Sequence, residues 1–160
     1  MADDPIIAFY LDSNLIKEQI GFTFSDVMKF YDDELESCHS YIQWLFPLKE
    51  PSAFNPDAPL VTPTTIDQYA EKYSIVAPRI DRAFWLMHQF YFDDKQYSWI
   101  TPNNHNYLRI TRIIKSLRIF QLYFDAAFFY NSLETLMQHS KYANIVGLEA
   151  RKFWNEAIKT

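Results

Sequence analysis

The stretch TPNNHNYLRITRIIKSLRIF, from Thr101 to Phe120, carries the pattern that decides the fold class. Its apolar residues recur at three- and four-residue steps, as on one face of an α-helix. The expected inward set is Tyr107, Ile110, Ile113, Ile114 and Leu117. Because proline is favoured in the first turn of a helix, we expect this helix to begin near Pro102. The opposite side forms a local basic surface of Arg109, Arg112, Lys115 and Arg118.

Glycine is scarce, with two glycines in 160 residues, Gly21 and Gly147. Glycine-rich loops that hold nucleotide phosphates and the nucleophile elbow of hydrolases need glycines that this chain lacks. Tight β-hairpin turns favour glycine as well. The composition therefore excludes these classes of enzyme and favours an all-α fold.

The length of 160 residues fits a single domain over residues 1–160. The apolar fraction of 49% supports a substantial core, and the charged fraction of 22% excludes wholesale disorder. The net charge of −5 provides no basic field of the kind that attracts nucleic acid. We therefore expect a globular domain that does not bind nucleic acid.

Cysteine usage and the N-terminal sequence indicate the compartment. Cys38 is the one cysteine, so an intramolecular disulfide and a multi-cysteine zinc site are excluded, and a reducing cytoplasm is expected. The start, MADDPIIAFYL, lacks the features of a signal peptide, and no run of about 18 apolar residues occurs. We expect a cytoplasmic protein without a transmembrane segment and without a cofactor.

Further patterns predict a bundle of about six helices. Thr23 and Asp26 are spaced as a capping box that opens one long amphipathic helix ending before Pro47. Its expected apolar stripe is Val27, Phe30, Tyr31, Leu35, Cys38, Ile42 and Leu45. Two later helices are expected at about Leu122 to His139 and about Asn144 to Ile158.

The segment between the first long helix and the later ones is rich in proline. Five of the eight prolines fall in residues 47–63, so this segment is expected to be a connector that crosses the surface. Thr64 and Asp67 read as a second capping box that opens a short helix to about Tyr73. Another helix near Pro78 is expected to bury one face, made of Ile80, Phe84, Met87 and Tyr91.

A polar row follows the predicted long helix. Its members are spaced to share one side of that helix: Asp32, Glu36, His39 and Gln43. The pair Glu36 and His39 has the Glu-x-x-His spacing that di-iron bundles use twice. The chain has no second pair of this kind, so a carboxylate-bridged metal centre is poorly supported.

The basic surface of the 101–120 helix raises a second question, because apolar Leu108 lies beside Arg112. A guanidinium among apolar neighbours needs a carboxylate partner, and Glu36 is the first candidate. The alternative is Glu34, whose position in the helical repeat directs it into the apolar stripe. Two readings stay open: a structural ion pair between helices, or a site for an acidic ligand. Asn106 falls on the isoleucine side and is expected to be buried and hydrogen-bonded.

Nucleophilic catalysis finds little support in the sequence, because no nucleophile has a base beside it. Cys38 lies in the predicted apolar stripe, where thiols are inert. His88 and His139 have no catalytic partner in the sequence, and His105 lies one turn before Arg109.

Three segments resemble, in order, the opioid growth factor receptor (OGFr) conserved-domain family. They are DDELESCHSYIQWLFPL (Asp32 to Leu48), FNPDAPL (Phe54 to Leu60) and HNYLRITRIIKSL (His105 to Leu117). LMHQFYF, from Leu86 to Phe92, resembles the middle helix of the family. One departure is Gln121, which stands where a helix-ending glycine is typical of the family.

The resemblance implies a receptor-like role. The family takes its name from animal receptors for the peptide Met-enkephalin, which act at the nuclear envelope. The resemblance thus implies a nuclear or perinuclear location for the animal members, which also carry long additional C-terminal regions. This chain resembles the conserved domain alone. Signalling receptor activity and peptide binding are therefore expectations from the resemblance.

The leading hypothesis is a non-enzymatic module that binds a short peptide or a small acidic ligand. The residues that carry both the resemblance and the polar faces are proposed as the site: Glu36, His39, Gln43, Trp44, His105, Asn106, Arg109 and Arg112. One alternative is a metal-assisted hydrolase that uses Glu36, His39 and His105. Another is a structural, self-associating helical protein with its aromatic residues at an interface.

Overall fold

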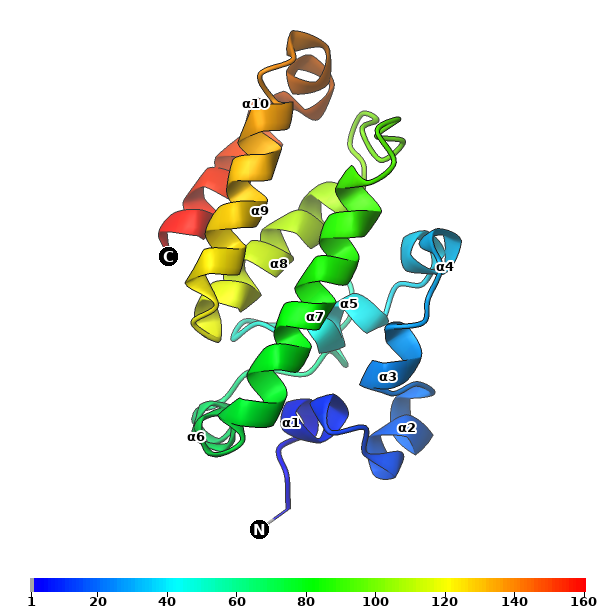
Figure 1. Cartoon of the computed structure of the whole chain (residues 1–160), viewed down its shortest axis with the longest axis vertical. Helices are drawn as coiled ribbons and strands as arrows, with labels where there is room; N and C mark the ends of the chain where they lie inside the picture. The colour runs from blue at the N-terminus through cyan, green and yellow to red at the C-terminus, as the bar shows by residue number, and fades with distance from the viewer. Residues whose placement is uncertain (1) are drawn as a thin grey trace. The chain divides into compact units, whose positions relative to one another are not determined.

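A computed structural model describes residues 2–160, and in this range the chain is all-helical (Figure 1). The helices are α1 (Pro5–Tyr10), α2 (Asn14–Ile20), α3 (Phe24–Val27), α4 (Asp32–Ser37), α5 (Tyr41–Leu45), α6 (Pro63–Glu71), α7 (Tyr73–Phe92), α8 (Asn106–Ile119), α9 (Tyr123–Leu136) and α10 (Ser140–Lys159). The all-α class expected from the glycine scarcity and the helical periodicity is confirmed.

The chain divides within α7 into two compact units, one up to Leu86 and the other from Met87 to Thr160. Each unit has its own buried core, and each is described by itself below. That residues 1–160 act as one domain stays a prediction.

The first unit is built around α1, which is buried along most of its length. Asp4 caps this helix by accepting a hydrogen bond from the backbone N–H of Ile6 at 2.9 Å. The second carboxylate oxygen of Asp4 accepts a hydrogen bond from Thr65 of α6 at 2.9 Å. Phe9 of α1 packs against Trp44 of α5 with ring centroids 5.6 Å apart. These contacts join α1 to α5 and α6, two helices that lie much later in the sequence of the first unit.

The single long helix expected from Thr23 to Leu45 is wrong, because three short helices, α3, α4 and α5, occupy this stretch. The capping box that opens α3 is confirmed: the backbone N–H of Thr23 donates to Asp26 at 2.9 Å and lowers the pKa of that carboxyl. A second start follows, where the backbone N–H of Tyr31 donates to Glu34 at 3.1 Å. At Cys38 the backbone becomes extended, which ends α4.

The broken helix changes the environment of several residues expected in its apolar stripe. Val27, Leu35, Ile42 and Leu45 are buried as expected. Tyr31 is 77% exposed and Cys38 is exposed, so both were wrongly assigned to the stripe. Glu34 does not point into the stripe either, since it is exposed and caps α4. The carboxylates of Asp32, Asp33 and Glu34 instead lie at the positive N-terminal end of α4.

The proline-rich connector leads from α5 to α6. Within the described residues it contains one isolated parallel β-bridge between Leu48 and Leu60, closed by a hydrogen bond from Val61 N–H to Leu48 O at 2.9 Å. The expected capping box at Thr64 is wrong, because Thr62 caps α6 and Pro63 is its first residue. Proline is well suited to this first position, where its missing N–H costs no helical hydrogen bond.

Helix α7 begins before the expected start near Pro78, at Tyr73, so this proline lies inside the helix. The expected inward face is confirmed: Ile80, Phe84, Met87 and Tyr91 are each at most 1% exposed. Position 78 lies near the N-terminal end of α7, where few backbone hydrogen bonds of the helix precede it. This position limits the free-energy cost of a proline there.

The second unit is built around α8, which contacts both α9 and α10. The inward face expected for α8 is confirmed, since Ile110, Ile113, Ile114 and Leu117 are all 0% exposed. Trp154 of α10 is also fully buried, and its indole N–H donates to Tyr107 O at 3.1 Å. Helix α8 begins at Asn106 and not near Pro102, because residues 101–103 form a bend and a turn, with Asn103 at a φ of 57°.

Helix α10 starts at Ser140, earlier than expected, and contains a kink at Gly147 with φ 85° and ψ 165°. Only glycine adopts this backbone conformation readily, so the kink explains why one of the two glycines stands in a helix. The sequence prediction of a start near Asn144 mistook the first turns of α10 for a loop.

Candidate functional site

Four of the eight expected site residues lie in the first unit. Glu36 is half-buried on α4, His39 is exposed in the link between α4 and α5, and both Gln43 and Trp44 are buried on α5. The predicted row of Asp32, Glu36, His39 and Gln43 therefore does not share one helix face. The physical reason is the extended backbone at Cys38, which separates α4 from α5.

Gln43 and Trp44 have clear packing roles in α5. With its amide oriented to suit its neighbours, the Gln43 nitrogen donates to the carbonyl oxygens of His39 and Ser40, at 2.9 Å each. Gln43 thereby holds the link that precedes its own helix. Trp44 is 5% exposed and packs on Phe9, so it offers little surface to a ligand.

The other four residues lie at the start of the second unit, on or beside α8. His105 is exposed at the N-cap position, Asn106 is 0% exposed, Arg109 is 6% exposed, and Arg112 is half-buried. The sequence reasoning had placed Arg109 and Arg112 on a face that is not simply wet, and their burial confirms this. Leu108, one residue before Arg109, is 55% exposed.

Asn106 is the most tightly bonded member of the candidate site. Its Oδ1 accepts a hydrogen bond from the Tyr91 hydroxyl at 2.9 Å, and its Nδ2 donates to Asn104 Oδ1 at 2.9 Å. Its backbone N–H also donates to Asn104 Oδ1. The prediction that Asn106 would be buried and hydrogen-bonded is confirmed, and its side chain fixes the start of α8 against α7 within the second unit.

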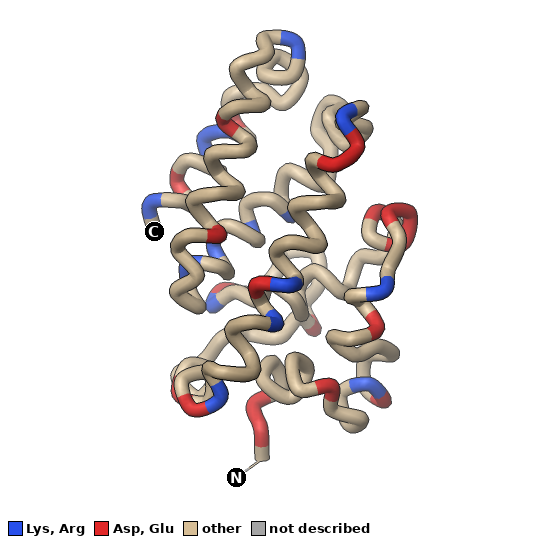
Figure 2. The backbone as a smooth tube through the Cα atoms, in the orientation of Figure 1, with Lys and Arg blue, Asp and Glu red and all other residues tan. Residues whose placement is uncertain are grey.

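The chain places the two groups of four residues in different units, so their meeting in one cluster stays a prediction. Charge is distributed unevenly between the units. The residues up to Leu86 include six Lys or Arg and fourteen Asp or Glu, whereas those from Met87 include nine and six. Acidic residues gather on α4, as Figure 2 shows. The basic residues of α8 thus lie in the unit that favours an anionic ligand.

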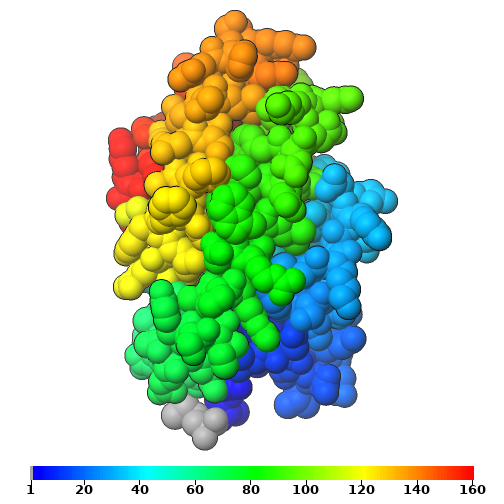
Figure 3. Space-filling view, in the orientation of Figure 1, coloured from blue at the N-terminus to red at the C-terminus, as the bar shows by residue number. Residues whose placement is uncertain are grey.

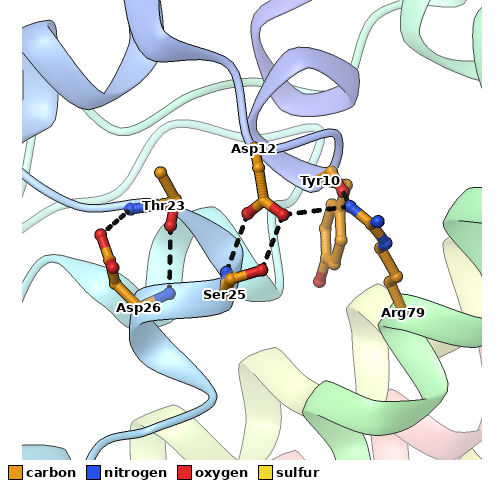
Figure 4. A network of polar contacts seen from close by, with 6 residues as sticks. All are labelled: Tyr10, Asp12, Thr23, Ser25, Asp26 and Arg79. Atoms are coloured by element: carbon orange, nitrogen blue, oxygen red, sulfur yellow. Dashed lines mark hydrogen bonds and ion pairs between the residues drawn. The ribbon is translucent and has the colours of Figure 1, made fainter.

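A polar network in the first unit was missed by the sequence reasoning (Figure 4). Ser25 donates to Asp12 from its backbone N–H at 2.9 Å and from its hydroxyl at 2.6 Å. Arg79 of α7 donates to Tyr10 O at 2.6 Å and forms an ion pair with Asp12 at 3.4 Å. The Arg79 guanidinium also lies 5.7 Å from the Phe24 ring centre.

The signal for this network is weak in the sequence, because Asp12 and Arg79 are far apart along the chain. Asp12 has a φ of 59°, a conformation that Asp tolerates better than most residues, and the run Asp12-Ser13-Asn14 is typical of a turn before a helix. Every side chain in Figure 4 serves a turn, a cap or an interhelical contact. The network therefore has a structural role.

His88, which appeared isolated in the sequence, lies among aromatic rings. Its ring centre is 4.7 Å from that of Phe92 and 5.1 Å from that of Phe128. Its Nε2 lies 3.1 Å from the Ser132 hydroxyl, which itself donates to Phe128 O at 3.0 Å. Burial lowers the pKa of His88, while the nearby Asp93 opposes this shift.

Two absences in the described part of the chain concern metal binding and the membrane. In residues 2–160, no group of three His, Cys, Asp or Glu side chains is arranged to hold a metal ion. None of the helices in the same range is both long and apolar enough to cross a membrane.

Comparison with known proteins identifies relatives over most of the chain. Residues 2–160 match the family model described as the opioid growth factor receptor (OGFr) conserved region. The chain is 34% identical over 134 residues to the human opioid growth factor receptor, an alignment that covers 72% of this chain and 19% of the relative. It is 35% identical over 116 residues to the mouse receptor, covering 61% and 18%.

Opioid growth factor receptor-like protein 1 of Xenopus tropicalis is 35% identical over 100 residues, covering 53% of this chain and 19% of the relative. The alignments therefore span about a fifth of these relatives. No solved structure matches the chain. Because the family model covers nearly every residue, the chain belongs to the opioid growth factor receptor conserved-region family.

Proposed function

We propose that this protein is a non-enzymatic binding module for a short peptide or a small acidic ligand, and that Arg109 and Arg112 of α8 bind the carboxylate of that ligand. Family membership supports a binding role, because the relatives are named receptors for an opioid growth factor. Those relatives are much longer, so their activity is carried to this chain as part of the proposal.

The observation that carries the proposal is the pair of arginines on α8, of which Arg112 is the one that a ligand can reach. Arg109 is 6% exposed, so it offers little surface of its own and contributes mainly its positive charge. Arg112, three residues later on the same helix, is half-buried and thus open to solvent in part. A guanidinium in such a setting binds a carboxylate in two parallel hydrogen bonds, more strongly than at an exposed site.

The other expected site residues are assigned supporting roles. Asn106 fixes the start of α8 through Tyr91, and His105 lies exposed at the same end. Glu36, His39, Gln43 and Trp44 remain site residues predicted from the family resemblance, and Gln43 and Trp44 also have packing roles in α5. We also propose a reducing, cytoplasmic environment, which suits the exposed thiol of Cys38.

The test is isothermal titration calorimetry of the whole chain with Met-enkephalin and with its C-terminal amide. We expect saturable binding of the free acid, and binding at least ten times weaker for the amide, because the amide lacks the carboxylate. Arg112→Gln is expected to weaken binding of the free acid and to abolish the preference for it.

The matched control is Lys152→Gln, which removes a positive charge from a 73% exposed side chain of α10. It is expected to leave both affinities unchanged. The proposed carboxylate site would be wrong if the acid and the amide bind the wild-type chain equally, or if Arg112→Gln lowers the melting temperature while leaving the affinity intact.

A further inference from the structure

Helix α8 exposes an apolar side chain where a helix at a protein surface normally exposes charged ones. Leu108 is 55% exposed, more than any other residue of Asn106–Ile119. The cationic residues of the helix are less accessible, with Arg109 buried and Arg112 half-buried. The usual order of exposure is therefore reversed on this helix.

The exposure of Leu108 follows from the helical repeat. The fully buried residues Ile110, Ile113 and Leu117 mark the inward side of α8, and this helix contacts both α9 and α10. Leu108 lies on the opposite side of the helix from these residues. In the orientation of Figure 1, α8 lies behind α9, and the start of α9, coloured yellow, lies on the face shown in Figure 3.

Leu108 lies one helical turn before Arg112, so the two side chains share one side of α8. Helical side chains lean toward the N-terminal end of their helix, which brings the Arg112 guanidinium over the turn that carries Leu108. Thr111 is engaged within the helix, since its hydroxyl donates to Tyr107 O at 3.2 Å. A cation and an exposed apolar surface therefore lie within the span of one amino-acid residue.

We infer that Leu108 sets the specificity of the proposed carboxylate site: it contacts the side chain of the residue that bears the carboxylate, and it favours a large apolar side chain there. This inference rests on the proposed function, because Arg112 must first bind the carboxylate. A polar side chain at this place would lose water without gaining a hydrogen-bond partner from leucine.

The charge of the helix favours the same class of ligand. Helix α8 contains no Asp or Glu between Asn106 and Ile119, so an approaching carboxylate meets no like charge on this helix. The carboxylate supplies the attraction to Arg112, and the apolar side chain next to it covers Leu108. The ligand class is therefore a peptide that ends in a large apolar residue.

The expected preference follows from the area that such a contact removes from water. Complete burial of a leucine-sized side chain strengthens binding by about 10- to 150-fold. Leu108 covers one side of the ligand's side chain only, so about half of that free energy is expected, which corresponds to a preference of roughly three- to tenfold.

The test is isothermal titration calorimetry of the whole chain with two peptides that differ from Met-enkephalin in the last residue alone, which is leucine in one and asparagine in the other. These two residues have nearly the same shape but differ in polarity. The wild type is expected to bind the leucine peptide roughly three- to tenfold more tightly. In Leu108→Ser this preference is expected to fall below about twofold, whereas Leu108→Met, which stays apolar, is expected to keep it.

Arg112→Gln separates this inference from the proposed function, because it is expected to weaken the binding of both peptides alike. Leu15→Ser is the matched control, since Leu15 is 77% exposed on α2, and it is expected to leave the preference unchanged. Equal affinities of the two peptides for the wild type, or a preference that survives Leu108→Ser, would overturn the role of Leu108 while the carboxylate site stands. A wild-type chain that binds neither peptide would overturn both.

Discussion

Replacement of Gln121 by glycine is expected to stabilise the protein, although it removes a side chain. Gln121 follows the C-terminal end of α8 and has a φ of 62°. The backbone N–H of Leu122 donates to Leu117 O at 2.8 Å, and that of Gln121 donates to Arg118 O at 3.1 Å. This pair of hydrogen bonds defines a Schellman motif, in which the residue at positive φ is most often glycine.

The magnitude follows from the backbone conformation. A residue with a Cβ atom pays about 1–2 kcal/mol in the left-handed region. Glycine avoids this strain but loses about 0.5–1 kcal/mol more conformational entropy on folding. The difference leaves Gln121→Gly more stable by about 0.5–1 kcal/mol, which corresponds to a rise of about 1–4 °C in melting temperature for a chain of this size.

Differential scanning calorimetry at fixed pH measures this change. Gln121→Ala is expected to give no gain, because alanine retains the Cβ atom. Gln19→Gly, at an exposed position inside α2, is expected to lower the stability by about 1 kcal/mol, because there the backbone is helical. If Gln121→Gly melts at or below the wild-type temperature, backbone strain at the end of α8 is refuted.

Three further predictions concern the two units. Gly147→Ala is expected to destabilise the protein by about 1–3 kcal/mol, measured by urea unfolding, because the φ of 85° and ψ of 165° suit only glycine; an unchanged midpoint would contradict this. A double-mutant cycle of Asp12→Ala and Arg79→Met is expected to give a coupling free energy of about 0.5 kcal/mol, since both side chains are about a third exposed. This coupling free energy should decline as the salt concentration rises, and a value that salt leaves unchanged would refute the ion pair. The free energy of unfolding is expected to fall as the pH drops below about 6.5, because the lowered pKa of His88 lets the unfolded chain take up the proton more readily. His88→Phe should flatten that slope, and an equally steep slope in the variant would exclude His88 as its source.

The sequence was sufficient to predict the helical class and the inward face of α8. Both depend on local information: the scarcity of glycine, and a run of apolar residues at helical spacing that is not interrupted between Asn106 and Ile119. The same reasoning identified the inward face of α7, because Ile80, Phe84, Met87 and Tyr91 keep the spacing beyond Pro78.

Periodicity failed between Thr23 and Leu45, where three short helices happen to continue one apolar spacing. The informative signals were residues that favour the start or the end of a helix over its interior. Three consecutive acidic residues, from Asp32 to Glu34, favour a helix start over a helix interior, and Ser37 and Ser40 favour helix ends. Buried residues on every side of α5 then removed the polar row, because a helix enclosed by the core has no wet face.

The candidate site could be predicted only in part. The burial of Asn106 is predicted by its position on the isoleucine side of α8 and is observed, whereas Arg109, which was assigned to the opposite basic surface, is buried as well. The packing of Trp44 on Phe9 and the pairing of Asp12 with Arg79 depend on contacts between residues far apart in sequence, which no local pattern specifies. Every residue of α5 is buried, so Gln43 and Trp44 have packing roles, although the family resemblance had marked both as site residues.

The carboxylate site on α8 is tested most directly by NMR of the chain with ¹⁵N-labelled arginine. Met-enkephalin is titrated while the side-chain Nε–H signals are followed. The account predicts saturable shifts of the Arg109 and Arg112 signals with the free acid, much smaller shifts with the amide, and unchanged signals from Arg79 and Arg151. Saturable binding that leaves the Arg109 and Arg112 signals in place, or no shift of any arginine signal at millimolar peptide, would contradict it.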